Sequence, residues 1–152
     1  MFRGANAINL DPKGRLTIPT RYRQALMDDC QGQLVCTIDN RQSCLLLYPL
    51  PNWDIIEEKI SNFSTMNADE RRISRLLIGH AHDVDMDKSG RVLVAPVLRQ
   101  FANLDKEIMM VGQRNRIEIW SQKTWYAQVE EDRAAEQAAQ YENSERLQDF
   151  SL

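Results

Sequence analysis

Long apolar runs are missing from this sequence of 152 residues. No stretch approaches the roughly 18 consecutive apolar residues of a membrane-spanning helix, so we expect no membrane association. The N-terminus, MFRGANAINLDPKGR, lacks the apolar core and cleavage site of a secretory signal. We therefore expect a cytoplasmic protein.

Cysteine and histidine are also scarce. The three cysteines, Cys30, Cys36 and Cys44, are an odd number, and their spacings match neither a disulfide framework nor a CxxC metal site. This pattern predicts reduced, partly buried thiols. The only two histidines, His80 and His82, would share a face if both lay on one strand, but no third histidine stands at ligand spacing. We expect neither a bound metal nor a cofactor.

The common catalytic motifs are absent. The chain has no G-x-S-x-G nucleophile elbow, no P-loop and no G-x-G-x-x-G dinucleotide motif. The sequence therefore predicts a protein that is not an enzyme. Apolar residues at 43% and charged residues at 27% are nevertheless typical of a folded globular protein.

Charge is distributed unevenly along the chain, although the whole chain carries a net charge of only −3. Residues 1–23 hold five basic side chains against Asp11, a local net charge of +4. Residues 130–152 hold two basic side chains against seven acidic ones, a net charge of −5. Because local potential steers a polyanion, the N-terminal segment is compatible with nucleic-acid binding.

The chain repeats itself at an offset of 76 residues, half of its length. Asp11-Pro-Lys-Gly-Arg15 falls on Asp87-Lys-Ser-Gly-Arg91, and similar segments follow both motifs. A fixed offset with a shared downstream layout indicates a tandem duplication. We expect two modules, residues 1–76 with a strand core at about 5–52 and residues 77–152 with a core at about 81–124.

Hydrophobic alternation and turn residues predict the same order of elements in both halves. For the first half, this order is strands at 7–11 and 15–18, a helix at 20–28, a hairpin at 34–38 and 44–48, and a helix at 53–63. The second half has its strand at 83–87, its hairpin at 108–111 and 116–120, and its helix at 125–140. An extra helix is predicted between the halves, with Asn67 as its N-cap and Gly79 as its stop.

A half of this size buries too little surface to be more than marginally stable alone. We therefore expect an α+β fold in which both halves contribute strands to a shared β-barrel with an internal pseudo-twofold repeat.

The two D-x-x-G-R turns carry the most informative chemistry. Lys13 and Arg15 would project from a turn between two strands, and an arginine fork can grip guanine or phosphate. Alternatively, each aspartate and arginine form a local salt bridge that merely shapes the turn. Arg71, Arg72 and Arg75 on the extra helix similarly suit either a solvated face or a second phosphate contact.

Several motifs together resemble the MraZ family of bacterial transcriptional regulators: Met1-Phe-Arg-Gly4, Leu10-Asp-x-Lys-Gly-Arg-Leu-x-Ile-Pro19, Leu47-Tyr-Pro49, Glu70-Arg-Arg72, Asp87-x-x-Gly-Arg91 and Leu98-Arg99. The resemblance runs from residue 1 to about residue 125. It implies two SpoVT/AbrB-type modules that interlock as an AbrB-like swapped-hairpin barrel. It further implies a ring-like homo-oligomer, associated with the nucleoid, that binds direct repeats of double-stranded DNA. The family represses its own operon, the division and cell-wall cluster.

The resemblance also suggests roles for the first turn. Arg15 and Lys13 would be the principal DNA contacts, with Arg3 adding charge beside them. Gly14 would permit the turn, and Asp11 would orient Arg15.

In the second turn, Lys88 and Arg91 would be the corresponding DNA-binding residues, with Asp87 and Gly90 shaping the turn. Asp83 and Asp85 make this segment more acidic, which predicts a weaker role for the second copy.

Two alternatives stay open. The chain could be a ring-forming protein-interaction module without DNA binding, in which both turns are structural. It could also be an antitoxin-like protein with the AbrB fold, although residues 130–152 are rich in helix-forming Ala, Glu and Gln rather than typical of a disordered toxin-binding tail.

Overall fold

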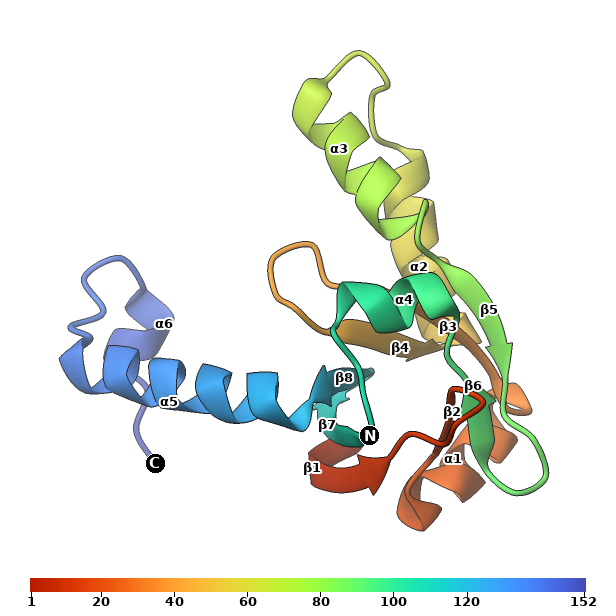
Figure 1. Ribbon diagram of the computed structural model, residues 1–152. Coiled ribbons are helices and arrows are strands. Elements are labelled where there is room, and N and C mark those ends of the chain that lie inside the picture. The colour runs from red at the N-terminus through yellow and green to blue at the C-terminus, as the bar shows by residue number, and fades with distance from the viewer. The chain divides into compact units, whose positions relative to one another are not determined.

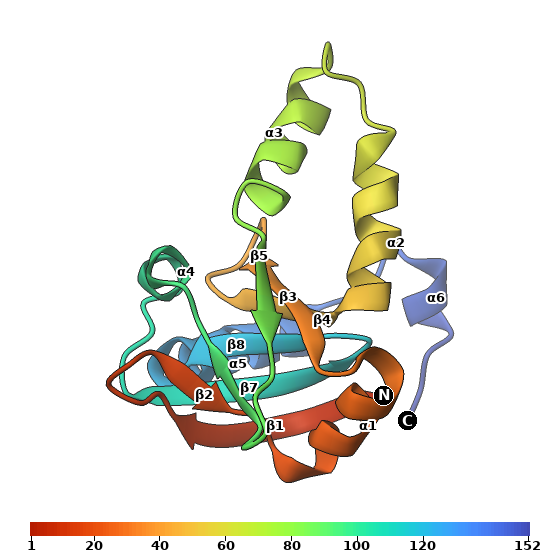
Figure 2. The same cartoon turned by 90° about the vertical axis from the view of Figure 1, so that its right-hand side faces the viewer.

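The computed structural model describes residues 1–152 and divides them into two compact units, Met1–Gln122 and Lys123–Leu152. The first unit contains all eight strands, which form an antiparallel six-stranded sheet and a separate two-stranded ribbon. Four helices accompany these strands within the first unit (Figures 1 and 2). The structure therefore confirms a mixed α+β fold.

The elements of the first half are β1 (Phe2–Asn9), β2 (Arg15–Thr17), α1 (Thr20–Cys30), β3 (Gln33–Ile38), β4 (Leu45–Pro49), α2 (Leu50–Ser61) and α3 (Ala68–Leu77). Those of the second half, up to residue 121, are β5 (His82–Asp85), β6 (Arg91–Leu93), α4 (Pro96–Phe101), β7 (Glu107–Arg114) and β8 (Ile117–Ser121). The predicted hairpins are confirmed, since β3 pairs with β4 and β7 pairs with β8.

The six-stranded sheet has the order β1-β7-β8-β4-β3-β5, so strands of the two sequence halves are interleaved. β1 lies beside β7, with Ile8 opposite Ile108, and β4 lies beside β8, with Leu46 opposite Glu118. β5 forms one edge of this sheet, next to β3. Neither half could form this sheet without the other.

The two-stranded ribbon joins the halves once more. β2 pairs with β6 in antiparallel register, with Leu16 opposite Val92. Both side chains are buried, at 0% and 2% exposure, and both belong to the hydrophobic core. Leu16 and Ile18 are buried while Thr17 between them is exposed, which is the alternation expected of the strand predicted at 15–18.

The first strand is longer than expected. β1 starts at Phe2 rather than near residue 7, and it pairs with β7 along its full length. Its early residues alternate weakly in hydrophobicity, so local sequence does not mark them as a strand. Their pairing partner, residues 107–114, lies about a hundred positions further along the chain.

The helix ends follow local capping chemistry. Asn67 is the N-cap of α3 as predicted, because its side-chain oxygen accepts hydrogen bonds from the backbone N–H groups of Asp69 and Glu70. α1 runs to Cys30, two residues beyond its predicted end, and is closed by Gln31 in the left-handed conformation. α2 and α3 lie side by side and project from the sheet as an arm (Figures 1 and 2).

The second unit consists mainly of helix. α5 spans Gln122–Ala138, where the sequence predicted residues 125–140, and a short α6 spans Glu145–Gln148. No residue of either helix is buried. Each helix of the structure is too short or too polar to cross a lipid bilayer.

Candidate nucleic-acid interface

The first D-x-x-G-R turn connects β1 to β2 and is closed by the Asp11 side chain. Asp11 Oδ1 accepts the backbone N–H groups of Lys13 (2.9 Å) and Arg15 (2.8 Å), while Oδ2 accepts Arg15 Nε at 2.7 Å. A further backbone hydrogen bond joins Gly14 N to Asp11 O at 3.0 Å. Gly14 has φ +86°, a conformation that glycine adopts without strain.

The second turn, between β5 and β6, repeats this hydrogen bonding. Asp87 Oδ1 accepts the backbone N–H groups of Ser89 (2.8 Å) and Arg91 (2.9 Å), and Oδ2 accepts Arg91 Nε at 2.9 Å. Gly90 has φ +76°. The salt-bridged side chains are somewhat more exposed here, at 38% and 40%, than the 31% of both Asp11 and Arg15.

Both carboxylates are held in the ionised form. The backbone N–H of Arg15 is the main cause that lowers the pKa of Asp11, and the backbone N–H of Arg91 does the same for Asp87. Each aspartate therefore neutralises one guanidinium within its own turn. Lys13, by contrast, is exposed and forms no ion pair, so its charge faces solvent.

The turns are coupled through the β2–β6 ribbon. Ile18 N donates to Gly90 O at 2.7 Å, and Val94 N donates to Gly14 O at 2.9 Å. Each turn thus supplies a backbone acceptor to the residue that follows the ribbon strand of the other half. Because the ribbon is antiparallel, the two turns lie at its opposite ends.

Arg3 does not lie beside the first turn. It stands at the start of β1, whereas the turn follows the end of that strand, and a strand rises about 3.3 Å per residue. The expectation that Arg3 adds charge beside Lys13 and Arg15 is therefore wrong. The Arg3 carbonyl instead accepts hydrogen bonds from Arg21 Nη2 (3.1 Å) and from the Tyr22 hydroxyl.

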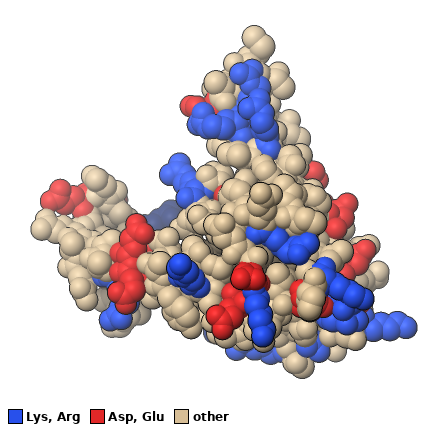
Figure 3. Space-filling view, viewed as in Figure 1, with Lys and Arg blue, Asp and Glu red and all other residues tan.

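Basic side chains also gather on the α2–α3 arm, while basic and acidic side chains are mixed over the rest of this face (Figure 3). Arg72 pairs with Asp69 at 2.9 Å, and Arg71 donates to the Thr65 carbonyl at 3.2 Å. Arg75 is exposed. These contacts agree with a solvated helix face.

The histidines do not share a strand face. β5 begins at His82, and His80 lies in the preceding turn, where its Nδ1 is 2.7 Å from the Leu76 carbonyl oxygen. The condition for a shared face is therefore not met, because the turn after α3 uses residues up to Ala81. Asp83 and Asp85 are exposed on the edge strand β5.

All three cysteines are free, as expected, and they are buried rather than partly buried. Burial raises the pKa of Cys36 to about 12. Burial and the neighbouring Glu118 carboxylate raise the pKa of Cys44.

Tertiary structure creates one cluster of potential metal ligands that sequence spacing did not indicate. The donor atoms of Asp39, Cys44 and Glu118 lie within 4.8 Å of one another. Trp120 Nε1 donates to Glu118 Oε1 at 3.0 Å, and Arg116 Nη2 is 4.0 Å from Glu118 Oε2. With a guanidinium already beside the carboxylate, the cluster is a buried charge network rather than a vacant ligand cage.

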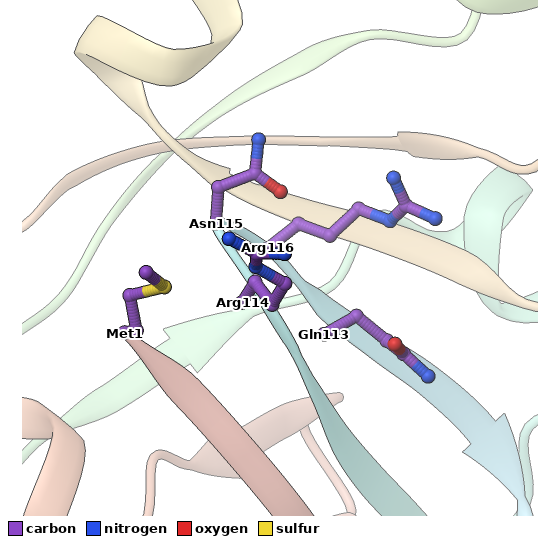
Figure 4. A pocket seen from close by; sticks show the side chains of 5 residues that line it. All are labelled: Met1, Gln113, Arg114, Asn115 and Arg116. Carbon is purple, nitrogen blue, oxygen red and sulfur yellow. The ribbon is translucent and has the colours of Figure 1, made fainter. Parts of the chain in front are cut away.

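An open hollow of about 450 Å³ lies beside the β7–β8 turn. Figure 4 shows its five lining residues, which come from the N-terminus and from this turn: Met1, Gln113, Arg114, Asn115 and Arg116. They bring together no pairing of nucleophile and general base. The arrangement suits the binding of an anion better than catalysis.

Comparison with known proteins identifies the family of this chain. A profile of the family described as "MraZ protein, putative antitoxin-like" matches residues 1–76 and again residues 77–149. A relative named "Transcriptional regulator MraZ" from Pseudoalteromonas atlantica is 64% identical over 152 residues, which is 100% of both chains. Relatives of the same name from Klebsiella pneumoniae (strain 342) and Salmonella paratyphi A are 62% and 61% identical, again over 100% of both chains.

The relatives that this chain resembles are therefore named as transcriptional regulators. The chain belongs to the MraZ family.

Proposed function

We propose that this chain is a sequence-specific DNA-binding transcriptional regulator. The observation that carries the proposal is the pair of D-x-x-G-R turns with the same hydrogen bonds, coupled across one β-ribbon. The name of the relatives, transcriptional regulator, supports it. A regulator of this kind catalyses no reaction and needs no cofactor.

Arg15 and Lys13 are the principal contacts in this proposal. The guanidinium of Arg15 donates to Asp11 through its Nε, which leaves its terminal amino groups free to bind guanine or phosphate. Gly14 permits the turn, and Asp11 orients Arg15. Arg3 contributes charge at a separate place on the surface.

The second turn plays a weaker part. Lys88 and Arg91 are its basic residues, and Asp87 and Gly90 shape it. Asp83 and Asp85 lie exposed on the adjoining strand β5 and repel phosphate.

The two modules, residues 1–76 and 77–152, form an AbrB-like swapped-hairpin barrel with pseudo-twofold symmetry in this proposal. The interleaved strand order supports it, since exchanging each strand with its counterpart in the other half gives the same order read from the opposite edge of the sheet. The antiparallel β2–β6 ribbon is compatible with the same symmetry.

Each chain offers few contacts, so affinity comes from a ring-like oligomer on promoter direct repeats. Linked engagement raises affinity by roughly 10²–10⁴ without new contacts. The protein represses its own operon, the division and cell-wall cluster, and resides on the cytoplasmic nucleoid. The acidic C-terminal residues of the chain take no part in DNA binding.

The test compares Arg15→Ala, Arg91→Ala and the control Arg41→Ala, an exposed arginine in the β3–β4 loop. Each is titrated against a labelled duplex of the DNA upstream of the chain's own reading frame, at fixed salt. Loss of a bidentate contact costs about 1–3 kcal/mol per copy. We expect Arg15→Ala to weaken binding most, Arg91→Ala less and Arg41→Ala least.

Wild-type affinity in Arg15→Ala would contradict the proposal. Salt provides an independent check, because log affinity falls by about 0.9 per neutralised phosphate for each unit of log salt. A flat salt dependence together with an intact oligomer would favour the ring-forming protein-interaction module. Binding of a toxin-like protein in place of DNA would favour the antitoxin-like alternative, which the family's description also mentions.

A further inference from the structure

Each turn is packed against an arginine that belongs to the other half of the chain. A Cβ atom placed on Gly14 would lie 2.8 Å from the Cζ of Arg99, and one placed on Gly90 would lie 2.7 Å from the Cζ of Arg23. These distances are far shorter than ordinary van der Waals contact. The glycines therefore leave room for a guanidinium as well as adopting a positive φ.

The guanidinium of each arginine is held by one hydrogen bond, which its Nε donates to a backbone carbonyl. Arg99 Nε donates to the Val94 carbonyl at 3.1 Å, and Arg23 Nε donates to the Ile18 carbonyl at 2.8 Å. Val94 and Ile18 are the residues whose N–H groups bind the Gly14 and Gly90 carbonyls. The backbone that holds each turn in place thus also holds the arginine that covers it.

The terminal amino groups of these arginines have no protein acceptor, and neither side chain forms a salt bridge. Both residues are half-buried, so their free N–H groups reach solvent. Arg99 also lines an open hollow of about 440 Å³ together with Asp11, Asp105 and Lys106. A preorganised guanidinium with unsatisfied donors is well suited to bind a phosphate oxygen.

Charge strengthens the argument for the first turn. Arg15 neutralises Asp11, which leaves Lys13 and Arg99 as the cations that no ion pair compensates in this turn. In the second turn, Arg23 lies over Gly90 and Lys88 forms no ion pair, but Lys88 is one position nearer the turn aspartate than Lys13 is in the first turn. The carboxylates of Asp83 and Asp85 lie on the adjoining strand.

We propose that Arg99 and Arg23 bind backbone phosphates of duplex DNA, each completing the turn of the opposite half. The first anion site then consists of Lys13, Arg15 and Arg99, and the second of Lys88, Arg91 and Arg23. This inference rests on the proposed function. It makes the two halves interdependent, because damage to one half disables the turn of the other.

The experiment titrates Arg99→Gln and Arg23→Gln against the labelled upstream duplex and against a duplex of scrambled sequence, over a range of salt concentrations. Loss of one charged hydrogen bond predicts about tenfold weaker binding for Arg99→Gln. The slope of log affinity against log salt should fall by about 0.9 for each phosphate that the variant no longer neutralises. Arg23→Gln should show the smaller effect.

Two double-mutant cycles test whether Arg99 acts together with the turn of the opposite half. Arg99→Gln combined with Lys13→Gln should be non-additive, since both act in one site. Arg99→Gln combined with Lys88→Gln should be additive within about 0.5 kcal/mol, since they act in separate sites. Coupling of Arg99 to Lys88 instead of Lys13 would overturn the proposal.

The melting temperature and the variant Arg99→Lys distinguish phosphate binding by Arg99 from a purely structural role of this residue. The lysine variant keeps a positive charge beside the turn, so its salt slope should stay near that of the wild type even if its stability falls. An unchanged slope in a folded Arg99→Gln protein, or a reduced slope in folded Arg99→Lys, would refute phosphate binding. If the wild type itself binds neither duplex, the proposed function fails, whereas normal binding by Arg99→Gln defeats only this inference.

Discussion

Replacing Gly14 by alanine tests how the first turn is built. The residue has φ +86°, where a Cβ atom costs an L-residue about 1–2 kcal/mol. The new Cβ would also lie 2.8 Å from the Arg99 Cζ, so the guanidinium has to move away from the turn. Moving it endangers the Nε hydrogen bond to Val94, and a charged hydrogen bond contributes about 1.5–3 kcal/mol.

We therefore expect Gly14→Ala to lower the free energy of unfolding by about 2–4 kcal/mol, somewhat less than the two contributions added together, because the half-buried guanidinium can replace part of the lost hydrogen bond with water. For a chain of 152 residues this corresponds to a fall in melting temperature of about 6–12 °C. Urea denaturation and calorimetry at one fixed protein concentration measure the effect, since an oligomer's stability depends on concentration.

Two variants separate the contributions. Ser89→Ala changes an exposed side chain next to Gly90, the counterpart of Gly14 in the second turn, and should be nearly neutral. In Gly14→Ala/Arg99→Ala the guanidinium is already absent, so the double variant should cost less than the sum of the two single changes. A melting temperature of Gly14→Ala within about 2 °C of the wild type would refute the reasoning about both strain and crowding.

Further outcomes follow from packing, capping and titration. Leu16→Ala should destabilise the fold by about 2–5 kcal/mol in urea titrations, because this fully buried side chain joins the ribbon to the core. Asn67→Ala should remove the N-cap of α3 and cost about 1 kcal/mol, seen as a lower urea midpoint; an unchanged midpoint would show the cap to be dispensable. A thiol reagent at neutral pH should leave the native protein unmodified and react with all three cysteines in urea, since burial raises the pKa of Cys36 to about 12; rapid native labelling would contradict that burial. The lowered pKa values of Asp11 and Asp87 stabilise the fold above the ordinary carboxyl pKa of 3.8, and this contribution is lost as pH falls through the depressed values, so Asp11→Asn/Asp87→Asn should flatten the acid side of the melting-temperature profile.

Much of the local structure could be predicted from sequence because it depends on near neighbours. The alternation around Leu16, the capping role of Asn67 and both hairpins follow from short-range patterns. The closure of each turn by its own aspartate was one of two alternatives, and it involves residues only four positions apart. The geometry of the turn leaves the terminal amino groups of Arg15 free, so a local salt bridge and DNA contact are compatible.

Errors arose where local patterns were weak or several outcomes were compatible with them. The start of β1 at Phe2 depends on pairing with a distant strand, and it moves Arg3 away from the first turn. The strand predicted at 83–87 lies at His82–Asp85 in the structure, directly after the turn that contains His80. A period-two pattern cannot show where a preceding turn ends.

The sequence by itself determined the repeat, the identity of the turn residues and the chemistry available in each turn, since these reside in local order and side-chain type. Only the tertiary structure decided which segments meet. It interleaved strands of the two halves in one sheet, gathered Asp39, Cys44 and Glu118, and placed Arg99 and Arg23 over the glycines of the opposite turns. The spacing from Gly14 to Arg23 recurs from Gly90 to Arg99, yet it cannot reveal that the contacts are exchanged, because partner choice depends on long-range strand pairing and shared burial rather than on distance along the chain.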